Sequence, residues 1–259
     1  MRTGRGPRGR LKRAAIIVLV VLGVIVAVMA VYGFRQVRSA EAYTHSVIVN
    51  DLRAARWRRP NGAPIPFQIT HRDLSPRQIE ILVAVQDPGF YRHAGIDLST
   101  PGAGLTTITQ AIVKQLYFSH FKSGIAKIKQ SLIAVFVVDN LIAKEDQLTL
   151  FINAMFFGNV DGRPVVGLAA AAEAYYEKAV TELDEGQYIS LVAMLVMPGT
   201  FHLRDHPQWN RDRCDRIKAL IDGRYRPKGL MDQFYGELPQ EVIDAGLPAF
   251  SYFGEWYAD

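Results

Sequence analysis

The amino-acid sequence predicts an all-α domain that is attached to a membrane by a single N-terminal helix. Two observations carry this prediction: an apolar run without a charge over residues 14–34, and a helical spacing of apolar residues over most of residues 72–222. The alternation of apolar and polar residues that is typical of strands does not persist beyond a few positions in any segment. A chain of 259 residues has room for one substantial domain plus attachments.

The N-terminal apolar run is long enough to cross a lipid bilayer. At a rise of about 1.5 Å per residue, residues 14–34 would span the ~30 Å hydrocarbon core as a helix. Residues 1–13 carry basic side chains and no acidic ones, so we expect the N-terminus in the cytoplasm and the following domain on the outer face of the membrane. A cleaved signal peptide is the alternative, but its apolar core is usually only about 7–15 residues long, and the small-residue site near residues 39–42 is weak.

The net charge of +5 comes from this N-terminal segment. The segment holds six of the 30 Lys and Arg residues, which leaves 24 basic residues against 25 Asp and Glu in the rest of the chain. This balance argues against a nucleic-acid-binding protein. The single cysteine, Cys214, excludes an internal disulfide, and neither it nor His120, His202 and His206 has the spacing of metal ligands.

A polar connector is expected over residues 35–65, and helices follow it. Ser75 and Gln78 flank a proline at the first helical position, which predicts a capped helix start. Residues 131–143 are apolar on nearly all sides and predict a central buried helix.

The later helices are predicted in the same way. Apolar residues recur at helical spacing through residues 144–159, so we expect a helix that ends at Gly158. Thr181 is the expected N-cap of the next helix, and residues 209–222 predict one more amphipathic helix. Residues 226–259 form a tail rich in proline and aromatic residues, to which the sequence assigns no structure or role.

Four stretches that mix polar and aromatic residues stand out in the helical region. They read VQDPGFYRHAGID (85–97), GLTTITQAIVKQLYF (104–118), AKIKQSLIAVFVVD (126–139) and KEDQLTLFINAMFFGN (144–159). In this order and spacing they resemble the motifs of the peptidoglycan glycosyltransferases of family 51, in the monofunctional form. The resemblance implies a lysozyme-like, mostly helical domain over residues 66–225. It also implies the family's activity, which polymerises lipid II into glycan strands at the bacterial cytoplasmic membrane.

The resemblance places two carboxylates of the family at positions that carry amides in this chain. The first motif of the family has a catalytic Glu before an Asp, and this chain has Gln86 and Asp87 there. The third motif has a second functional Glu where this chain has Gln130, and an Arg where it has Ala126. The candidate catalytic positions are therefore Gln86, Gln130 and the neighbouring Asp87.

The other matching positions imply a set of substrate-binding residues. The chain departs from the family pattern at Ala111, Gln115 and Thr149, which stand where Gln, Asn and an acidic residue are usual. The implied binding residues are Phe90, His93, Thr107, Thr109, Gln110, Lys114, Lys127 and Asn153.

The chemistry of an amide predicts binding without turnover. An amide accepts a hydrogen bond but cannot hold a proton taken from a sugar hydroxyl. Assistance by a general base contributes roughly 10²–10⁴-fold to a rate. Replacing a carboxylate by an amide also removes a like charge facing the diphosphate of the substrate. We therefore expect a catalytically impaired or inactive protein that binds lipid II or nascent glycan strands.

Two alternatives remain beside this hypothesis. One is an active lipid II polymerase in which Asp87 serves as a relocated base, and the other is a non-catalytic adaptor of the cell-wall synthesis machinery. A lytic, lysozyme-like enzyme would also need a carboxylic acid at the position of Gln86. The implied partners are lipid II or another undecaprenyl-pyrophosphate-linked glycan, the bacterial inner membrane and active penicillin-binding proteins. No cofactor is expected apart from a divalent cation at the substrate pyrophosphate.

Overall fold

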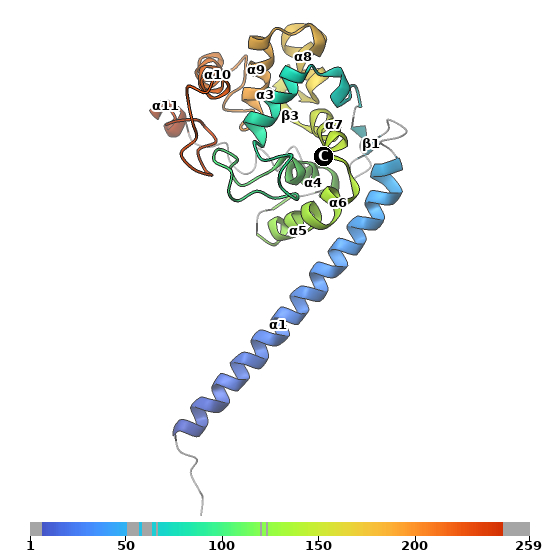
Figure 1. The fold of residues 1–259 in the computed structure, drawn as a ribbon, viewed down its shortest axis with the longest axis vertical. Helices are drawn as coiled ribbons and strands as arrows, with labels where there is room; N and C mark the ends of the chain where they lie inside the picture. The colour runs from blue at the N-terminus through green and yellow to red at the C-terminus, as the bar shows by residue number, and fades with distance from the viewer. Residues whose placement is uncertain are drawn as a thin grey trace, which may run out of the picture.

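The fold is a helical domain from which one long helix projects (Figure 1). The computed structural model describes residues 7–50, 57–58, 64–65, 67–119, 121–122 and 124–245. This architecture confirms the predicted mostly helical domain behind one long apolar helix. Residues 1–6 of the basic tail, His120 and residues 246–259 of the C-terminal tail lie outside the described residues.

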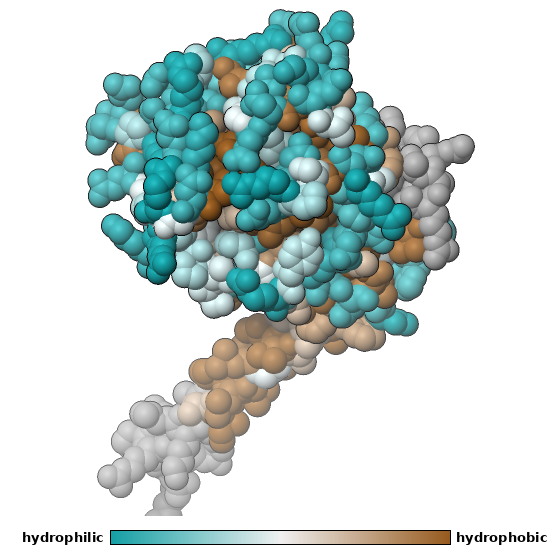
Figure 2. Space-filling model, turned by 45° about the horizontal axis from the view of Figure 1, so that its top comes forward, coloured by the Kyte–Doolittle hydropathy of each residue, from teal (hydrophilic) through white to brown (hydrophobic). Residues whose placement is uncertain are grey.

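The projecting helix is α1 (Pro7–Tyr43), and its apolar surface is exposed to solvent in the structure (Figure 2). The helical stretch Ala15–Ser46 is long and apolar enough to cross a membrane. The helix does not end at Phe34, where the polar connector was expected to begin. It continues to Tyr43 and into the π-helix η1 (Thr44–Ile48), because this part packs against the domain.

Buried side chains of α1 and η1 make the contact with the domain. Ala40, Thr44 and Ile48 are each at most 5% exposed. The hydroxyl oxygens of Thr44 and Tyr117 lie 2.6 Å apart. The apolar helix is therefore joined to the domain by a packed interface rather than by a polar connector alone.

The first part of the domain contains the helices that carry the motifs. A short hairpin of β1 (Trp57–Arg58) and β2 (Pro64–Ile65) and the 3-10 helix η2 (His71–Asp73) precede α3 (Pro76–Gln86). The predicted start of α3 is confirmed, because Ser75 and Gln78 form a reciprocal capping box. Then follow α4 (Ile108–Tyr117), α5 (Ile125–Ile133), the π-helix η3 (Ala134–Val138) and α6 (Asp139–Leu141).

The apolar stretch over residues 131–143 is helical almost to its end, as predicted, but it is not buried all round. Ile133, Ala134, Val137 and Val138 are fully buried, whereas Phe136 is 52% exposed. A helix that lies at the edge of the domain buries only the stripe that faces the core.

The next helix, α7 (Lys144–Ala154), ends before Gly158, so the predicted helix end was wrong. The chain leaves the helix at Met155 and forms an antiparallel hairpin of β3 (Phe156–Val160) and β4 (Arg163–Val166). Gly158 lies inside this hairpin with φ of 88°, and a Cβ there would come within 2.5 Å of His202 Cδ2. The close packing of His202 against Gly158 therefore leaves no room for a larger side chain at this position.

The remaining helices complete the core. They are α8 (Leu168–Tyr176), the 3-10 helix η4 (Val180–Glu182), α9 (Glu185–Met194), α10 (Pro207–Ile221) and α11 (Gln240–Asp244). The cap of α9 is Asp184 and not Thr181, because Asp184 accepts from the backbone N–H of Gln187. The helices α3, α4, α7 and α9 supply nearly half of the buried apolar side chains, such as Ile81, Ile112, Leu150 and Val192.

Candidate functional site

A cavity of about 540 Å³ opens where the end of α3, the first turns of α4 and the segment after α9 meet. Its volume lies within the range of ligand pockets, about 300–1,000 Å³. Three of the predicted site residues line it: Gln86, Thr107 and Lys114. Most of the other lining side chains are apolar, and none of the lining residues described is an Asp or a Glu.

Gln86 is the last residue of α3 and is partly buried at the cavity. Its Nε2 lies 3.4 Å from the carbonyl oxygen of Val192, which is a long and weak hydrogen bond. The amide is therefore held loosely and lies where a ligand in the cavity can meet it.

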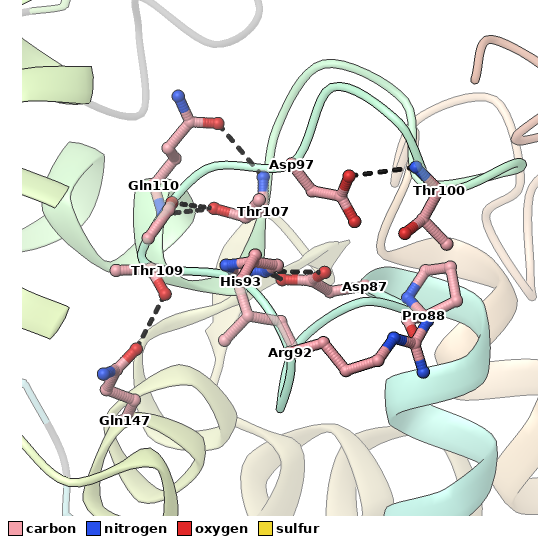
Figure 3. A network of polar contacts seen from close by, with 12 residues as sticks. Asp87, Pro88, Arg92, His93, Asp97, Thr100, Thr107, Thr109, Gln110 and Gln147 are labelled. Atoms are coloured by element: carbon pink, nitrogen blue, oxygen red, sulfur yellow. Dashed lines mark hydrogen bonds and ion pairs between the residues drawn. The ribbon is translucent and has the colours of Figure 1, made fainter. Parts of the chain in front are cut away.

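Asp87 follows Gln86 in sequence but does not line the cavity. Its carboxylate is fully buried and receives Nε2–H of His93 at 2.9 Å and the backbone N–H of Ile108 at 2.9 Å (Figure 3). Ile108 is the first residue of α4, so this charge also lies at the positive end of a helix dipole. Asp87 and His93 thus tie the loop after α3 to the start of α4.

The predicted binding residues at the start of α4 chiefly build the helix start. Thr107 is the N-cap, accepts from the backbone N–H of Gln110 at 3.1 Å and donates to the carbonyl of Gly95 at 2.7 Å. Gln110 completes the capping box and also donates to Ser131 Oγ at 3.0 Å. Thr109 is fully buried and donates to Gln147 Oε1 at 2.7 Å (Figure 3). Thr107 alone of these three lines the cavity.

Gln130 lies behind α4 and not in the cavity lining. It is 1% exposed, and its Nε2 donates to the carbonyl of Gln110 at 2.6 Å. Its Oε1 is buried and has no hydrogen-bond partner among the described residues. The orientation of the Gln130 side chain therefore depends on the hydrogen bond that its amide donates. An ionised carboxylate at this position could not donate that bond.

Three lysines lie around the second and third motifs. Burial, and then the neighbouring charge of Lys127, lowers the pKa of Lys114 to about 8. Lys127 donates to the carbonyl of Leu105 at 3.1 Å and to Thr106 Oγ1 at 3.2 Å, and burial lowers its pKa. Lys129 lies over the ring of Phe118 at 5.1 Å, and burial lowers its pKa as well. Lys114 is the one of the three that lines the cavity.

The other predicted binding residues hold the chain together. Asn153 is 1% exposed, accepts from the backbone N–H of Gln68 at 2.8 Å and donates to the carbonyl of Ile69 at 2.6 Å. Phe90 is fully buried beneath Lys144, whose Nζ lies 4.7 Å from the ring centre. Neither Asn153 nor Phe90 is among the described residues that line the cavity.

Sequence reasoning missed Arg213, a fully buried cation that reaches the cavity. Its guanidinium lies 5.3 Å from the ring centre of Phe201 and 5.6 Å from that of Phe234. Burial lowers its pKa to about 10, and among the described residues no carboxylate pairs with it. Arg213 lies on a helix crowded with charged residues, and no local signal distinguishes it from its solvated neighbours.

Sequence reasoning also missed the contribution of the C-terminal tail. Met231, Gln233 and Phe234 line the cavity, although they belong to the segment to which no role was assigned. Their contacts with the domain depend on tertiary structure alone.

Comparisons with known proteins identify the larger part of the chain. Residues 66–221 match the family described as Transglycosylase. Penicillin-binding protein 1F of Bacillus subtilis (strain 168) is 30% identical over 161 residues, which cover 57% of this chain and 22% of that protein. Penicillin-binding protein 1A of Escherichia coli (strain K12) is 24% identical over 195 residues, covering 70% of this chain and 22% of that protein. Penicillin-binding protein 1A of Rickettsia felis is 31% identical over 185 residues, covering 65% and 22%. The aligned region thus spans about a fifth of the length of these relatives.

Proposed function

Because this chain belongs to the transglycosylase family, the peptidoglycan glycosyltransferases of family 51, we propose that it binds lipid II or nascent glycan strands in its cavity without polymerising them. In this proposal it is a protein of cell-wall biogenesis, held at the bacterial cytoplasmic membrane by α1 with its N-terminus in the cytoplasm. The apolar, exposed surface of α1 supports the membrane attachment.

The observation that carries the proposal is the charge of the cavity. Two cations, Lys114 and Arg213, line it together with the amide of Gln86, and no carboxylate is present among the described lining residues. A diphosphate carries negative charge that these cations attract, and burial strengthens the attraction because the local dielectric constant is low. A cavity of this kind favours an anionic ligand in its ground state.

The same lining lacks a group that can take a proton from a sugar hydroxyl. Gln86 occupies the position at which the family has its catalytic Glu, and an amide does not accept a proton at neutral pH. The loss of a general base, ~10²–10⁴-fold, corresponds to about 3–5 kcal/mol in the activation barrier. Under this proposal the protein keeps its affinity for the ligand, while the rate of strand synthesis falls.

Asp87 is not placed to replace the missing base. Both of its carboxylate oxygens are within 3.0 Å of His93 Nε2, and one of them also accepts from Ile108 N–H. To reach a ligand, the carboxylate would have to leave a fully buried position and give up its hydrogen bonds with His93 and Ile108, and a hydrogen bond to a charged group contributes about 1.5–3 kcal/mol. This geometry counts against an active polymerase with a relocated base.

The test is a lipid II polymerisation assay beside a lipid II binding assay on the same preparation of the full chain. We expect binding and no strand synthesis. The variant Lys114→Ala should weaken binding by about tenfold or more, since a hydrogen bond to a charged group contributes ~1.5–3 kcal/mol. Strand synthesis by the unmodified protein would refute the proposal, and so would equal binding by the native protein and the Lys114→Ala variant. Repeating both assays with EDTA tests whether a divalent cation accompanies the diphosphate.

A further inference from the structure

The residues that follow α10 form one wall of the cavity. We call residues 226–236 the strap; they lie beyond residues 66–221, which match the family. Met231, Gln233 and Phe234 of the strap line the cavity, and Met231 is 57% exposed at its rim. Figure 1 shows this segment beside the loop that leads into α4. Part of the site is therefore built from residues outside the matched region.

Main-chain hydrogen bonds join the strap to the loop before α4. The N–H of Gly102 donates to the carbonyl of Gly229 at 2.9 Å, and the N–H of Gly104 donates to the carbonyl of Leu230 at 2.7 Å. Gly104 has φ of 67°, and a Cβ there would lie 2.5 Å from Gln233 Oε1. The positive φ favours glycine at this position, and a side chain there would also have to displace the Gln233 side chain.

The other side of the strap is joined to α10 and α3. Nη1 and Nη2 of Arg213 both lie 3.3 Å from the carbonyl oxygen of Gln233. Tyr235 is 2% exposed and donates its hydroxyl to the carbonyl of Val85 at 2.9 Å, one residue before Gln86. The strap thus runs from the loop before α4 to the end of α3, across one end of the cavity.

Hydrogen bonds to Asp232 give the strap a defined shape and join it to Tyr225, the residue before it. The carboxylate of Asp232 accepts from the hydroxyl of Tyr225 at 2.7 Å, from the N–H of Lys228 at 2.9 Å and from the N–H of Gly236 at 3.1 Å. Burial raises the pKa of Asp232, but these hydrogen bonds outweigh it, so the net shift is downward and the carboxylate stays charged. A segment held by these hydrogen bonds does not move easily to make room for a ligand that would overlap it.

We propose that the strap closes one end of the cavity and restricts it to a lipid diphosphate that carries a single disaccharide, excluding longer glycan strands. This inference rests on the proposed function, and it selects one of the two ligands named there. A strand has to continue past the site, whereas here the side chains of Met231 and Phe234 wall one end of the cavity. The cavity of about 540 Å³ accordingly has the size of a site for one small ligand.

The experiment measures two affinities on the full chain in detergent or lipid nanodiscs. The probes are lipid II, with one disaccharide, and the same lipid diphosphate carrying three disaccharides. We expect the native protein to bind the shorter probe about tenfold more tightly or better, a difference of about 1.4 kcal/mol. The double variant Met231→Ala with Phe234→Ala should bring the two affinities within about threefold of each other, because it removes the side chains that form the wall.

Two single substitutions distinguish an effect of the strap on binding from a general loss of stability. Tyr235→Phe removes only the hydroxyl that holds the strap to Val85, and it should reduce the discrimination between the probes. Tyr176→Phe, which loses a comparable bond to Ser190 away from the cavity, should leave the discrimination unchanged. Equal binding of both probes by the native protein overturns the strap proposal alone, as does discrimination that persists in the double variant. Failure to bind either probe overturns the proposed function as well.

Discussion

Restoring a glutamate at position 130 should make the stability of the protein depend on pH. The side chain is 1% exposed, and its Nε2 donates to the carbonyl oxygen of Gln110 at 2.6 Å. In the variant Gln130→Glu, a protonated carboxyl group can keep this bond through its O–H. An ionised carboxylate would place a buried negative charge against a carbonyl oxygen, which raises the pKa of the new side chain.

The size of the effect follows from the cost of keeping the carboxyl group protonated. An unperturbed Glu has a pKa of about 4.3, and each pH unit above it costs about 1.36 kcal/mol. The upper limit is therefore about 1 kcal/mol at pH 5 and about 3.7 kcal/mol at pH 7. Because the folded-state pKa is raised, stability is kept below about pH 4.3 and lost as the pH rises toward the folded-state pKa.

Thermal unfolding of the full chain in detergent at pH 5 and pH 7 measures this difference. One kcal/mol shifts Tm by about 2–4 °C for a chain of this size, so we expect a fall of up to roughly 7–15 °C at pH 7 and a few degrees at pH 5. The matched control is Gln86→Glu, which faces the cavity with a bond of 3.4 Å and should respond less to pH. A Tm of Gln130→Glu that falls equally at both pH values, or at neither, would show that the amide does not face the main-chain carbonyl.

Three further predictions concern the site and its frame. Binding of an anionic ligand should weaken as the pH rises through the pKa of Lys114, which burial lowers to about 8, and Lys114→Arg should retain affinity at pH 9 in a titration of binding against pH. Asp87→Asn should lower stability by about 1.5–3 kcal/mol in thermal unfolding, because it weakens the buried hydrogen bond between this side chain and His93; lost activity at an unchanged Tm would instead mark a catalytic base. Gly89→Ala should cost about 1–3 kcal/mol or more, since its Cβ would lie 2.0 Å from Asp97 Oδ2, and unchanged thermal unfolding would contradict this packing.

The candidate site was predicted only in part from the sequence. Gln86, Thr107 and Lys114 line one cavity, because they stand at the end of α3, at the N-cap of α4 and within α4. Asn153 and Gln130 were taken as ligand-facing, yet they bond to the main chain of their own protein. A polar side chain in a motif can bind a ligand or can hydrogen-bond to the protein's own main chain. The local sequence does not distinguish these two roles.

By itself, the sequence determined the long apolar helix, the helical domain, the family resemblance and the amides at positions 86 and 130. These features depend on hydropathy, periodicity and residue identity, all of which are local. The tertiary structure alone decided that Arg213 is buried at the cavity without a carboxylate partner among the described residues, and that residues 229–235 return to form a wall. Both depend on contacts between residues far apart in the chain, such as Tyr235 with Val85, and only the folded packing brings such residues together.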